Sequence, residues 1–297
     1  FIVRGSRRDY IMVEYAVKTP PHHAPWQEFL DVWRATDECE AYAQAWNFDH
    51  FYSLGGDMYP GSGDSRGPCL ESWTMLAALA QATSRIRIGS MVNAMHFRHP
   101  AVTAKMATTL DIISDGRLDL GLGAGWNLEE SDAYGIELGT VTERLDRFEE
   151  GVEVIIRLLS QEVTDFEGRY YKITDARCEP KGIQHPHLPV LIGGGGRKRT
   201  LAIVAKWAQK WDGGFRSVLE WQDTNEALVG HCEAIGRDPS EIFRTVHIPW
   251  ESGADPSQLR DEAAAFGEVG VDQVIFNMQG PPSTAQVEKL GVELSGR

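Results

Sequence analysis

Short β-branched, apolar runs alternate with longer amphipathic segments along nearly the whole chain. Such an alternation of strands and helices is typical of a parallel sheet. About eight strand–helix pairs follow one another without a linker-like stretch, and eight such units favour a closed barrel, the (β/α)8 or TIM barrel. The strands are predicted at residues 13–17, 45–48, 85–92, 118–122, 189–192, near Trp211, at 245–248 and at 273–277.

A single domain spanning residues 1–297 is therefore expected. The runner-up architecture is a doubly wound open sheet. A dinucleotide-binding open sheet has G-x-G-x-x-G after its first strand, whereas residues 19–21 here are Thr-Pro-Pro, which favours the barrel. Residues 1–12 are expected to be an N-terminal extension, native or added, and do not enter the prediction of the fold.

Two further features refine this barrel. The clearest helical periodicity lies at 141–159, and Thr140 followed by Glu143 predicts a capping box at its start. Residues 163–182 break the alternation of strands and helices. They are predicted to form a hairpin insertion.

The charge balance excludes several classes of partner. The 297 residues carry 29 Lys and Arg against 43 Asp and Glu, a formal net charge of −14, which argues against a surface devoted to nucleic acid. No apolar run approaches the roughly 18–20 residues of a membrane-spanning helix, and the first residues do not resemble a signal peptide.

Scattered cysteines without a C-x-x-C pair predict reduced thiols, and hence a cytoplasmic protein, rather than a disulfide framework or zinc site. These cysteines are Cys39, Cys69, Cys178 and Cys232.

A glycine run after the fifth predicted strand is the main candidate for binding an anion. Residues 193–196 are all glycine and are followed by Arg197, Lys198 and Arg199. Glycines permit close backbone approach, and the N–H groups that open the next helix can bind a phosphate. The alternative is a flexible loop with a solvated basic helix start.

Asp49 and His50 are the best candidates for acid–base chemistry. They follow the second predicted strand, and the reacting residues of such a barrel lie where strands end. An imidazole titrates near pH 7, and a carboxylate can set its tautomer and orientation. The alternative for His50 is a structural hydrogen-bonding role. The other histidines lack the spacing of metal ligands, so no metal site is expected.

The fourth predicted strand ends in a second glycine-rich stretch, residues 121–125. This stretch is either a tight strand-to-helix turn or a surface on which a flat ring lies. Composition does not decide between the two.

Several segments together resemble the bacterial luciferase-like superfamily, and within it the oxidoreductases that depend on the deazaflavin coenzyme F420. The resemblance covers about residues 13–277, and the order and spacing of its segments are more specific than any one of them. The segments are 47–51, 85–92, 98–102, 114–126 and 166–171.

The resemblance implies a (β/α)8 barrel with insertions, a homodimer, and a flavin-like ring at the carboxyl ends of the strands. It implies a bulge in the third strand with a non-proline cis peptide bond, which maps to the bond between Ser90 and Met91. Asp49 and His50 match positions near the polar edge of the ring and the substrate. The implied cofactor-binding residues are Ser90, Met91, Asn93, Gly125, Gly194, Gly195, Gly196 and Arg197, the last four at the cofactor phosphate.

Trp126 departs from one branch of this superfamily. The sugar-phosphate dehydrogenases have Glu where this chain has Trp126, which implies an apolar wall near the substrate. The expected activity is therefore F420-dependent hydride transfer to or from a small, fairly apolar carbonyl, alcohol or enone, with His50 moving the proton. The alternatives are a monooxygenase that uses reduced FMN, and a non-catalytic barrel that binds a flavin.

Overall fold

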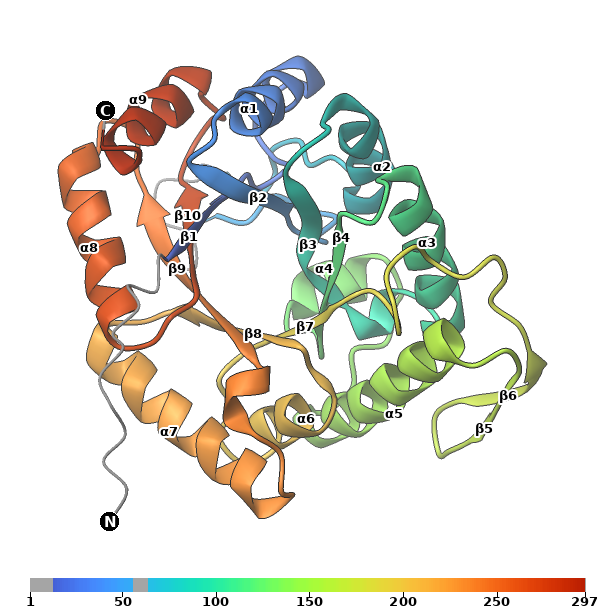
Figure 1. Cartoon of the computed structure of the whole chain (residues 1–297). Helices are drawn as coiled ribbons and strands as arrows, with labels where there is room; N and C mark the ends of the chain where they lie inside the picture. The colour runs from blue at the N-terminus through green and yellow to red at the C-terminus, as the bar shows by residue number, and fades with distance from the viewer. Residues whose placement is uncertain (1–12, 56–63, 297) are drawn as a thin grey trace, which may run out of the picture.

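The computed structural model describes residues 13–55 and 64–296, and their main body is a closed barrel of eight parallel strands surrounded by helices (Figure 1). The predicted (β/α)8 architecture is confirmed. The order around the barrel is β1-β10-β9-β8-β7-β4-β3-β2. The strands are β1 (Glu14–Lys18), β2 (Tyr42–Asn47), β3 (Arg87–Ala94), β4 (Leu118–Gly123), β7 (Val190–Gly193), β8 (Lys210–Phe215), β9 (Phe243–Trp250) and β10 (Gln273–Met278).

The helices form a ring outside the strands (Figure 1). Thr140 caps α5 through the predicted capping box with Glu143, because each side chain bonds to the other residue's backbone N–H. The short helix α4 was not predicted, and it carries a residue of the candidate site. The helices are α1 (Trp26–Glu38), α2 (Ser72–Ala82), α3 (Pro100–Ile113), α4 (Leu128–Ala133), α5 (Val141–Ser160), α6 (Thr200–Trp207), α7 (Val218–Ala234), α8 (Pro256–Glu268) and α9 (Thr284–Leu294), with 3₁₀ turns at Met95–Phe97 and Pro239–Glu241.

The insertion at 163–182 contains the expected hairpin. Strands β5 (Thr164–Glu167) and β6 (Lys172–Ala176) pair antiparallel and project from the barrel beyond α5 (Figure 1). The N-terminal segment 1–12 lies outside the described residues, as does part of the loop that follows β2. None of the helices in the described ranges is long and apolar enough to cross a membrane.

Side chains fill the inside of the barrel in layers, as alternation along each strand requires. The middle layer is apolar and consists of Ala16, Trp46, Met91, Leu191 and Ile275. A polar layer lies toward the amino ends of the strands, where Gln44, Arg87 and Lys210 bond to Asp119. A second polar layer lies toward the carboxyl ends and comprises Lys18, Asp212, His247 and Asn277.

The bulge expected in β3 is present, but its cis peptide bond joins Met91 and Val92 rather than Ser90 and Met91. The predicted position was wrong by one residue. Pairing with β4 breaks after Ser90 and resumes at Asn93, so the cis bond lies in the middle of the unpaired stretch. A sequence segment locates the bulge but does not determine which of its consecutive bonds is cis.

Glycines on the neighbouring strands make room for this bulge. A Cβ on Gly121 would lie 2.2 Å from the carbonyl oxygen of Ser90, and one on Gly123 would lie 2.6 Å from the Val92 side chain. A Cβ on Gly193 would lie 3.0 Å from the same side chain. The inner surface of β4 and β7 is therefore nearly bare backbone around Val92, and we call Val92, Gly121, Gly123 and Gly193 the glycine wall.

Candidate active site

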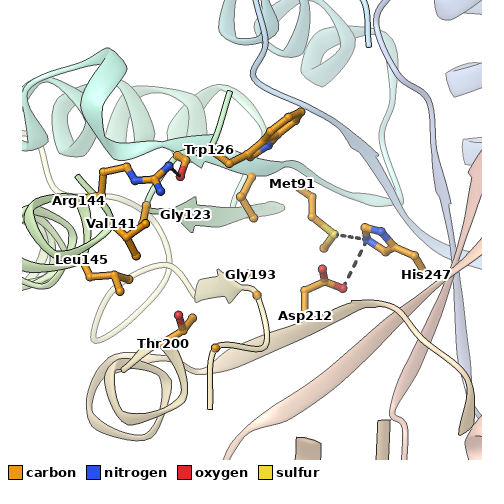
Figure 2. Close-up of a pocket in the computed structure, with 15 residues that line it drawn as sticks. Met91, Gly123, Trp126, Val141, Arg144, Leu145, Gly193, Thr200, Asp212 and His247 are labelled. Carbon is orange, nitrogen blue, oxygen red and sulfur yellow. Dashed lines mark hydrogen bonds and ion pairs between the residues drawn. The ribbon is translucent and has the colours of Figure 1, made fainter. Parts of the chain in front are cut away.

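A cavity of about 450 Å³ opens at the carboxyl ends of the strands (Figure 2). Met91, Asp212 and His247 lie on one side of it, and Val141, Arg144 and Leu145 of α5 lie on the other (Figure 2). The remaining lining residues are Val92, Gly123, Ala124, Gly125, Trp126, Gly193, Gly194, Gly196 and Thr200. This is where a barrel of this kind places its active site.

A smaller cavity of about 110 Å³ adjoins the first and contains both predicted acid–base residues in its walls. The two cavities share Met91, Val92, Gly125 and Trp126. The β3 bulge and the glycine turn after β4 thus lie between the two cavities, and we call the two adjoining cavities together the cleft. The smaller cavity is further lined by Phe48, Asp49, His50, Ala94, His96, Phe97, Asn127 and Glu130.

His50 is oriented by Glu130, a residue that was not predicted. The Nδ1 atom of His50 lies 2.5 Å from the Oε1 atom of Glu130, whose side chain is fully buried. The other carboxylate oxygen of Glu130 accepts the backbone N–H of Phe51 at 2.9 Å. A carboxylate can only accept, so Nδ1 carries the proton of the neutral imidazole and Nε2 is left to act on a ligand.

In the described ranges the Asp49 side chain forms no hydrogen bond with His50, and instead forms a two-pronged ion pair with Arg98, at 2.5 and 3.0 Å. Arg98 also donates to Glu71 at 2.8 Å. Burial raises the pKa of Asp49, and the Arg98 guanidinium opposes that rise. Asp49 therefore lines the cleft as part of a buried ion pair, and Glu130 has the orienting role that the sequence suggested for Asp49.

His96 is a second imidazole in the smaller cavity. Its Nε2 lies 2.9 Å from the Ser131 hydroxyl, which donates its own proton to the carbonyl of Asn127 at 2.6 Å. Nε2 of His96 therefore donates, and Nδ1 has no partner among the described residues. Burial lowers the pKa of His96 to about 4, so this ring is neutral at pH 7.

Gly125 fits tightly against His96. Its φ of 86° lies in the left-handed region that favours glycine, and a Cβ there would lie 2.4 Å from Nδ1 of His96. Gly125 lines both cavities, as expected of a residue at a cofactor. Its role in binding one stays a prediction.

The glycine run at 193–196 opens onto the larger cavity. Gly194 has a φ of 114°, and a Cβ on Gly196 would lie 2.7 Å from the Thr200 hydroxyl. A Cβ on Gly195 would lie 2.1 Å from a guanidinium nitrogen of Arg216, so that guanidinium lies directly over the turn. Thr200 and Arg216 were not predicted, although Thr200 begins the helix that follows the run.

Two of the basic residues after this run, Arg197 and Arg199, pair with carboxylates of other helices. Arg197 forms an ion pair with Asp223 of α7, and Arg199 lies 2.7 Å from Asp146 of α5. Arg197 does not line either cavity of the cleft. The cation against the glycines is therefore Arg216, which comes from the loop after β8.

The remaining predicted residues differ in where their side chains point. Met91 lines both cavities, whereas the Ser90 hydroxyl lies 3.0 Å from that of Ser72, away from the cleft. Asn93 donates to the carbonyl of Gly121 at 2.7 Å, and its side-chain oxygen is buried with no partner in the described ranges. An unpaired buried acceptor of this kind is costly unless a ligand or water pairs with it.

Trp126 lies between the two cavities and is 44% exposed. Its ring meets that of His50 edge-on, with centroids 5.3 Å apart and an angle of 63° between the planes. An apolar surface thus borders the acid–base pair, as the sequence suggested.

Asp212 is the charged residue on the Met91 side of the larger cavity, and Lys18 is buried in the same layer of the barrel. Thr245 donates to Asp212 at 2.9 Å, and Nε2 of His247 lies 3.4 Å from the same oxygen and 2.8 Å from the sulfur of Met91. Burial raises the pKa of Asp212 to about 6 and lowers that of Lys18 to about 8, and each charge partly offsets the other. Asp212, Thr245 and His247 were not predicted as site residues. Within residues 13–55 and 64–296, no three His, Cys, Asp or Glu side chains are arranged to hold a metal ion.

Comparison with known proteins agrees with this geometry. An uncharacterized protein of Mycobacterium tuberculosis is 31% identical over 247 residues, which cover 80% of this chain and 83% of the relative. A protein described as pyrimidine monooxygenase RutA, from Caulobacter segnis, is 33% identical over 239 residues, covering 73% of this chain and 66% of RutA.

A solved structure shares the fold almost throughout. An F420-dependent secondary alcohol dehydrogenase in complex with an F420–acetone adduct superposes with a TM-score of 0.83 at 16% identity, covering 95% of this chain and 98% of the other. The family model described as luciferase-like monooxygenase matches residues 11–289. The chain therefore belongs to the luciferase-like monooxygenase family.

Proposed function

We propose that this protein is an F420-dependent oxidoreductase that transfers a hydride between the deazaflavin and a small carbonyl, alcohol or enone substrate. The observation that carries the proposal is the His50–Glu130 pair at 2.5 Å, placed in the cleft beside the glycine wall. Such a pair can supply or remove the proton that must accompany a hydride when a carbonyl and an alcohol interconvert.

The residues of the cleft fit a flat ring with an anionic tail. Met91, Val92 and two glycines of the glycine wall border the larger cavity, so a flat group would lie against them. The side-chain oxygen of Asn93 lacks a partner among the described residues. Gly195 and Gly196, with Thr200 and Arg216, would hold the phosphate through backbone N–H groups, a hydroxyl and a guanidinium. Gly194, whose N–H donates to the carbonyl of Asp212 at 3.1 Å, would shape the turn. Gly125 lines the same space, and Arg197 would act at longer range.

A deazaflavin, when bound, exchanges a hydride with a substrate carbon. His50 would hold the accompanying proton on Nε2 and donate it to the substrate oxygen, or accept it in the reverse direction. Glu130, accepting from Nδ1, stabilises the imidazolium that exists between these events. Asp49 would act indirectly, because Arg98 already holds its carboxylate.

The alternative is a monooxygenase that uses reduced FMN, and the similarity to pyrimidine monooxygenase RutA favours it. The same cleft would hold an FMN ring and its phosphate. A non-catalytic flavin-binding barrel is a weaker alternative, because such a protein has no need of a proton-transferring pair.

A cofactor titration with His50→Ala as the matched variant tests the proposal. We expect F420 to bind more tightly than FMN, as followed by the fluorescence of each ring. His50→Ala should lower turnover by about 10²- to 10⁴-fold while leaving the dissociation constant of the cofactor near that of the wild type. Tight FMN binding with substrate-dependent oxygen uptake would establish the alternative, and unchanged turnover would remove His50 from the mechanism.

We also propose that the protein is a homodimer of the cytoplasm. An apolar surface groove of about 630 Å³ between α2 and α3 supports self-association, and the four free cysteines, two of them buried, are compatible with a reducing compartment. Apolar residues of the groove include Trp73, Ala77, Met106, Leu110 and Ile113. Sedimentation velocity of the wild type against Ile113→Glu would test the dimer.

A further inference from the structure

Met91 stands at the boundary between the two cavities of the cleft. Its side chain is buried and lines both of them. A methionine side chain is unbranched and flexible, and it adapts to whatever surrounds it. A wall made of such a residue has a definite shape only where another group fixes its rotamer. In this cleft that group is His247.

His247 comes from β9 and presents its Nε2 atom to the sulfur of Met91. The two atoms are 2.8 Å apart, and Nε2 also lies 3.4 Å from the Oδ1 atom of Asp212 (Figure 2). A thioether sulfur and a carboxylate both accept hydrogen bonds, so the proton of the neutral imidazole lies on Nε2. Burial, helped by the charge of Lys18, lowers the pKa of His247 well below 6.5. The ring is therefore neutral at pH 7 and has one N–H to donate.

One N–H thus faces two acceptors, and the surroundings of Asp212 decide between them. An ionised carboxylate is a stronger acceptor than a thioether, so an otherwise unbonded Asp212 would take the N–H from Met91. Thr245 already donates to Oδ1 of Asp212 at 2.9 Å, and the backbone N–H of Gly214 also bonds to this carboxylate. With these donors in place, Asp212 lies farther from the imidazole than the sulfur does, and the N–H is left to Met91.

A fixed Met91 would favour the binding of a flat ring. Met91 and His247 both line the larger cavity, where the proposed function places the ring. A flexible side chain that is immobilised only when a ligand arrives weakens binding, whereas one that is already held does not. A held Met91 also keeps the boundary between the ring and the cavity of His50 constant, since Met91 lines that cavity too.

We propose that His247 is a positioning residue that fixes Met91 for the cofactor ring, and that Thr245 supports this role by occupying Asp212. The inference rests on the proposed function, because it takes the larger cavity as the site of the ring. His247 acts here through Met91 and not on the reacting atoms themselves.

Methyl NMR of the ligand-free protein, with isotope-labelled methionine methyl groups, tests the hold on Met91 directly. The chain has 7 methionines, and the Met91 signal is the one that Met91→Leu removes. The carbon shift of this methyl group reports the rotamer of the last side-chain bond. We expect a shift typical of one rotamer in the wild type. In His247→Phe, which keeps a ring but removes the N–H, we expect a shift averaged over several rotamers. His247→Gln, which keeps a donor, should stay nearer to the wild type.

Titration of the same proteins with F420 and with FMN measures what this hold contributes to binding. His247→Phe should raise the dissociation constant of the cofactor that binds by about two- to tenfold. In the Met91→Leu background, which has no sulfur to hold, the same substitution should change that constant by less than about twofold. Thr245→Val should also weaken the cofactor, because the freed Asp212 oxygen then draws the N–H away from Met91.

Thr224→Val is the matched control for Thr245→Val. Thr224 is also a buried threonine whose hydroxyl donates, but it bonds to the carbonyl of Glu220 within α7. This variant should leave the Met91 signal and the dissociation constant unchanged. Thermal melting shows whether each variant is folded.

Two results would overturn the proposal. One is a Met91 signal that does not move in His247→Phe, and the other is an equal effect of His247→Phe on cofactor binding with and without the Met91 sulfur. Should His247→Phe fail to fold, the same measurements on Thr245→Val decide the matter, and an unmoved Met91 signal there overturns the proposal.

The proposed function and the positioning role fail in different ways. Should neither F420 nor FMN bind, both fail, even where the Met91 signal responds to His247→Phe. Should a cofactor bind equally tightly to the wild type and to His247→Phe, the positioning role fails and the proposed function stands.

Discussion

Two buried aspartates inside the same barrel show opposite electrostatic behaviour. Asp119, toward the amino ends of the strands, accepts from Gln44 at 2.7 Å and from Lys210 at 2.6 Å, with Arg87 also paired to it. Burial alone would raise its pKa, but Lys210 and Arg87 bring the pKa below its usual value. Asp212, toward the carboxyl ends, has a pKa raised to about 6 because burial outweighs the more limited help of Lys18.

The contrast extends to the neighbours of each aspartate. Near Asp119, the Gln273 amide donates to Gln44 at 3.2 Å, and only the side-chain oxygen of Gln273 lacks a partner in the described ranges. In the layer of Asp212, both the nitrogen and the oxygen of the Asn277 amide lack a hydrogen-bond partner among the described residues. Buried polar groups that are paired with one another stabilise a fold, whereas unpaired ones are retained at a cost. The layer around Asp119 is therefore the better paired of the two, as a structural role requires.

Replacement of Asp119 should have the largest effect on stability. Asp119→Ala leaves Lys210 and Arg87 without their counterion, so we expect the free energy of unfolding to fall by about 3–5 kcal/mol. Asp212→Ala should cost less, about 1–2 kcal/mol, because Lys18, whose pKa is already lowered to about 8, loses its proton more readily. Urea denaturation of the two variants measures both values. Equal losses would contradict the distinction between the two ends.

Acid should weaken the carboxyl end first, through His22 in the loop after β1. Burial lowers the pKa of His22 to about 4, helped by His23 and His50, whereas the unfolded chain has the ordinary value of 6.5. Between pH 6.5 and 4, His22 binds a proton more strongly in the unfolded chain than in the folded one. The free energy of unfolding therefore falls as the pH falls through this range, by up to about 3 kcal/mol in total. The contribution of Asp119, whose pKa is lowered, is lost only below its unfolded value of 3.8.

A His22→Asn variant isolates this contribution. Asp212 shifts stability in the opposite direction below pH 6, because its raised pKa favours protonation in the folded state. That effect is common to the wild type and the variant and cancels in their difference. The difference in unfolding free energy between the two proteins, measured by urea denaturation from pH 7 to pH 4, should therefore narrow as the pH falls. A constant difference would show that His22 is not held neutral by the fold.

The sequence predicted the barrel better than the arrangement of side chains inside it, and the reason is physical. Strand periodicity and glycine runs are local signals, so the barrel and the position of the glycine turn at 193–196 could be predicted from them. Glu130 lies 80 positions from His50, and no spacing rule connects the two. Arg216 reaches the glycine turn only because β8 lies beside β7 in the barrel.

The polar layer at the carboxyl ends of the strands escaped prediction as a group because each of its strands contributes one residue. Lys18 ends β1 and Asn277 lies near the end of β10, and the chain pattern does not say that parallel pairing places them side by side. In strands covered on both faces, apolar periodicity also fails to distinguish the barrel interior from the side under the helices. The position of the cis bond was missed for a similar reason, since it depends on register rather than composition.

Replacement of Asn277 by an apolar residue should have the smallest effect on stability. Asn277→Leu keeps a similar volume and removes two buried polar atoms that have no partner among the described residues, so the free energy of unfolding should stay within about 1 kcal/mol of the wild type or rise. Gln44→Leu, at the amino end, should lower it, because the substitution takes one donor from Asp119. Urea denaturation of the ligand-free variants gives both values. A loss above about 2 kcal/mol in Asn277→Leu would mean that Asn277 is bonded within the fold, and the carboxyl-end layer would then be as structural as that around Asp119.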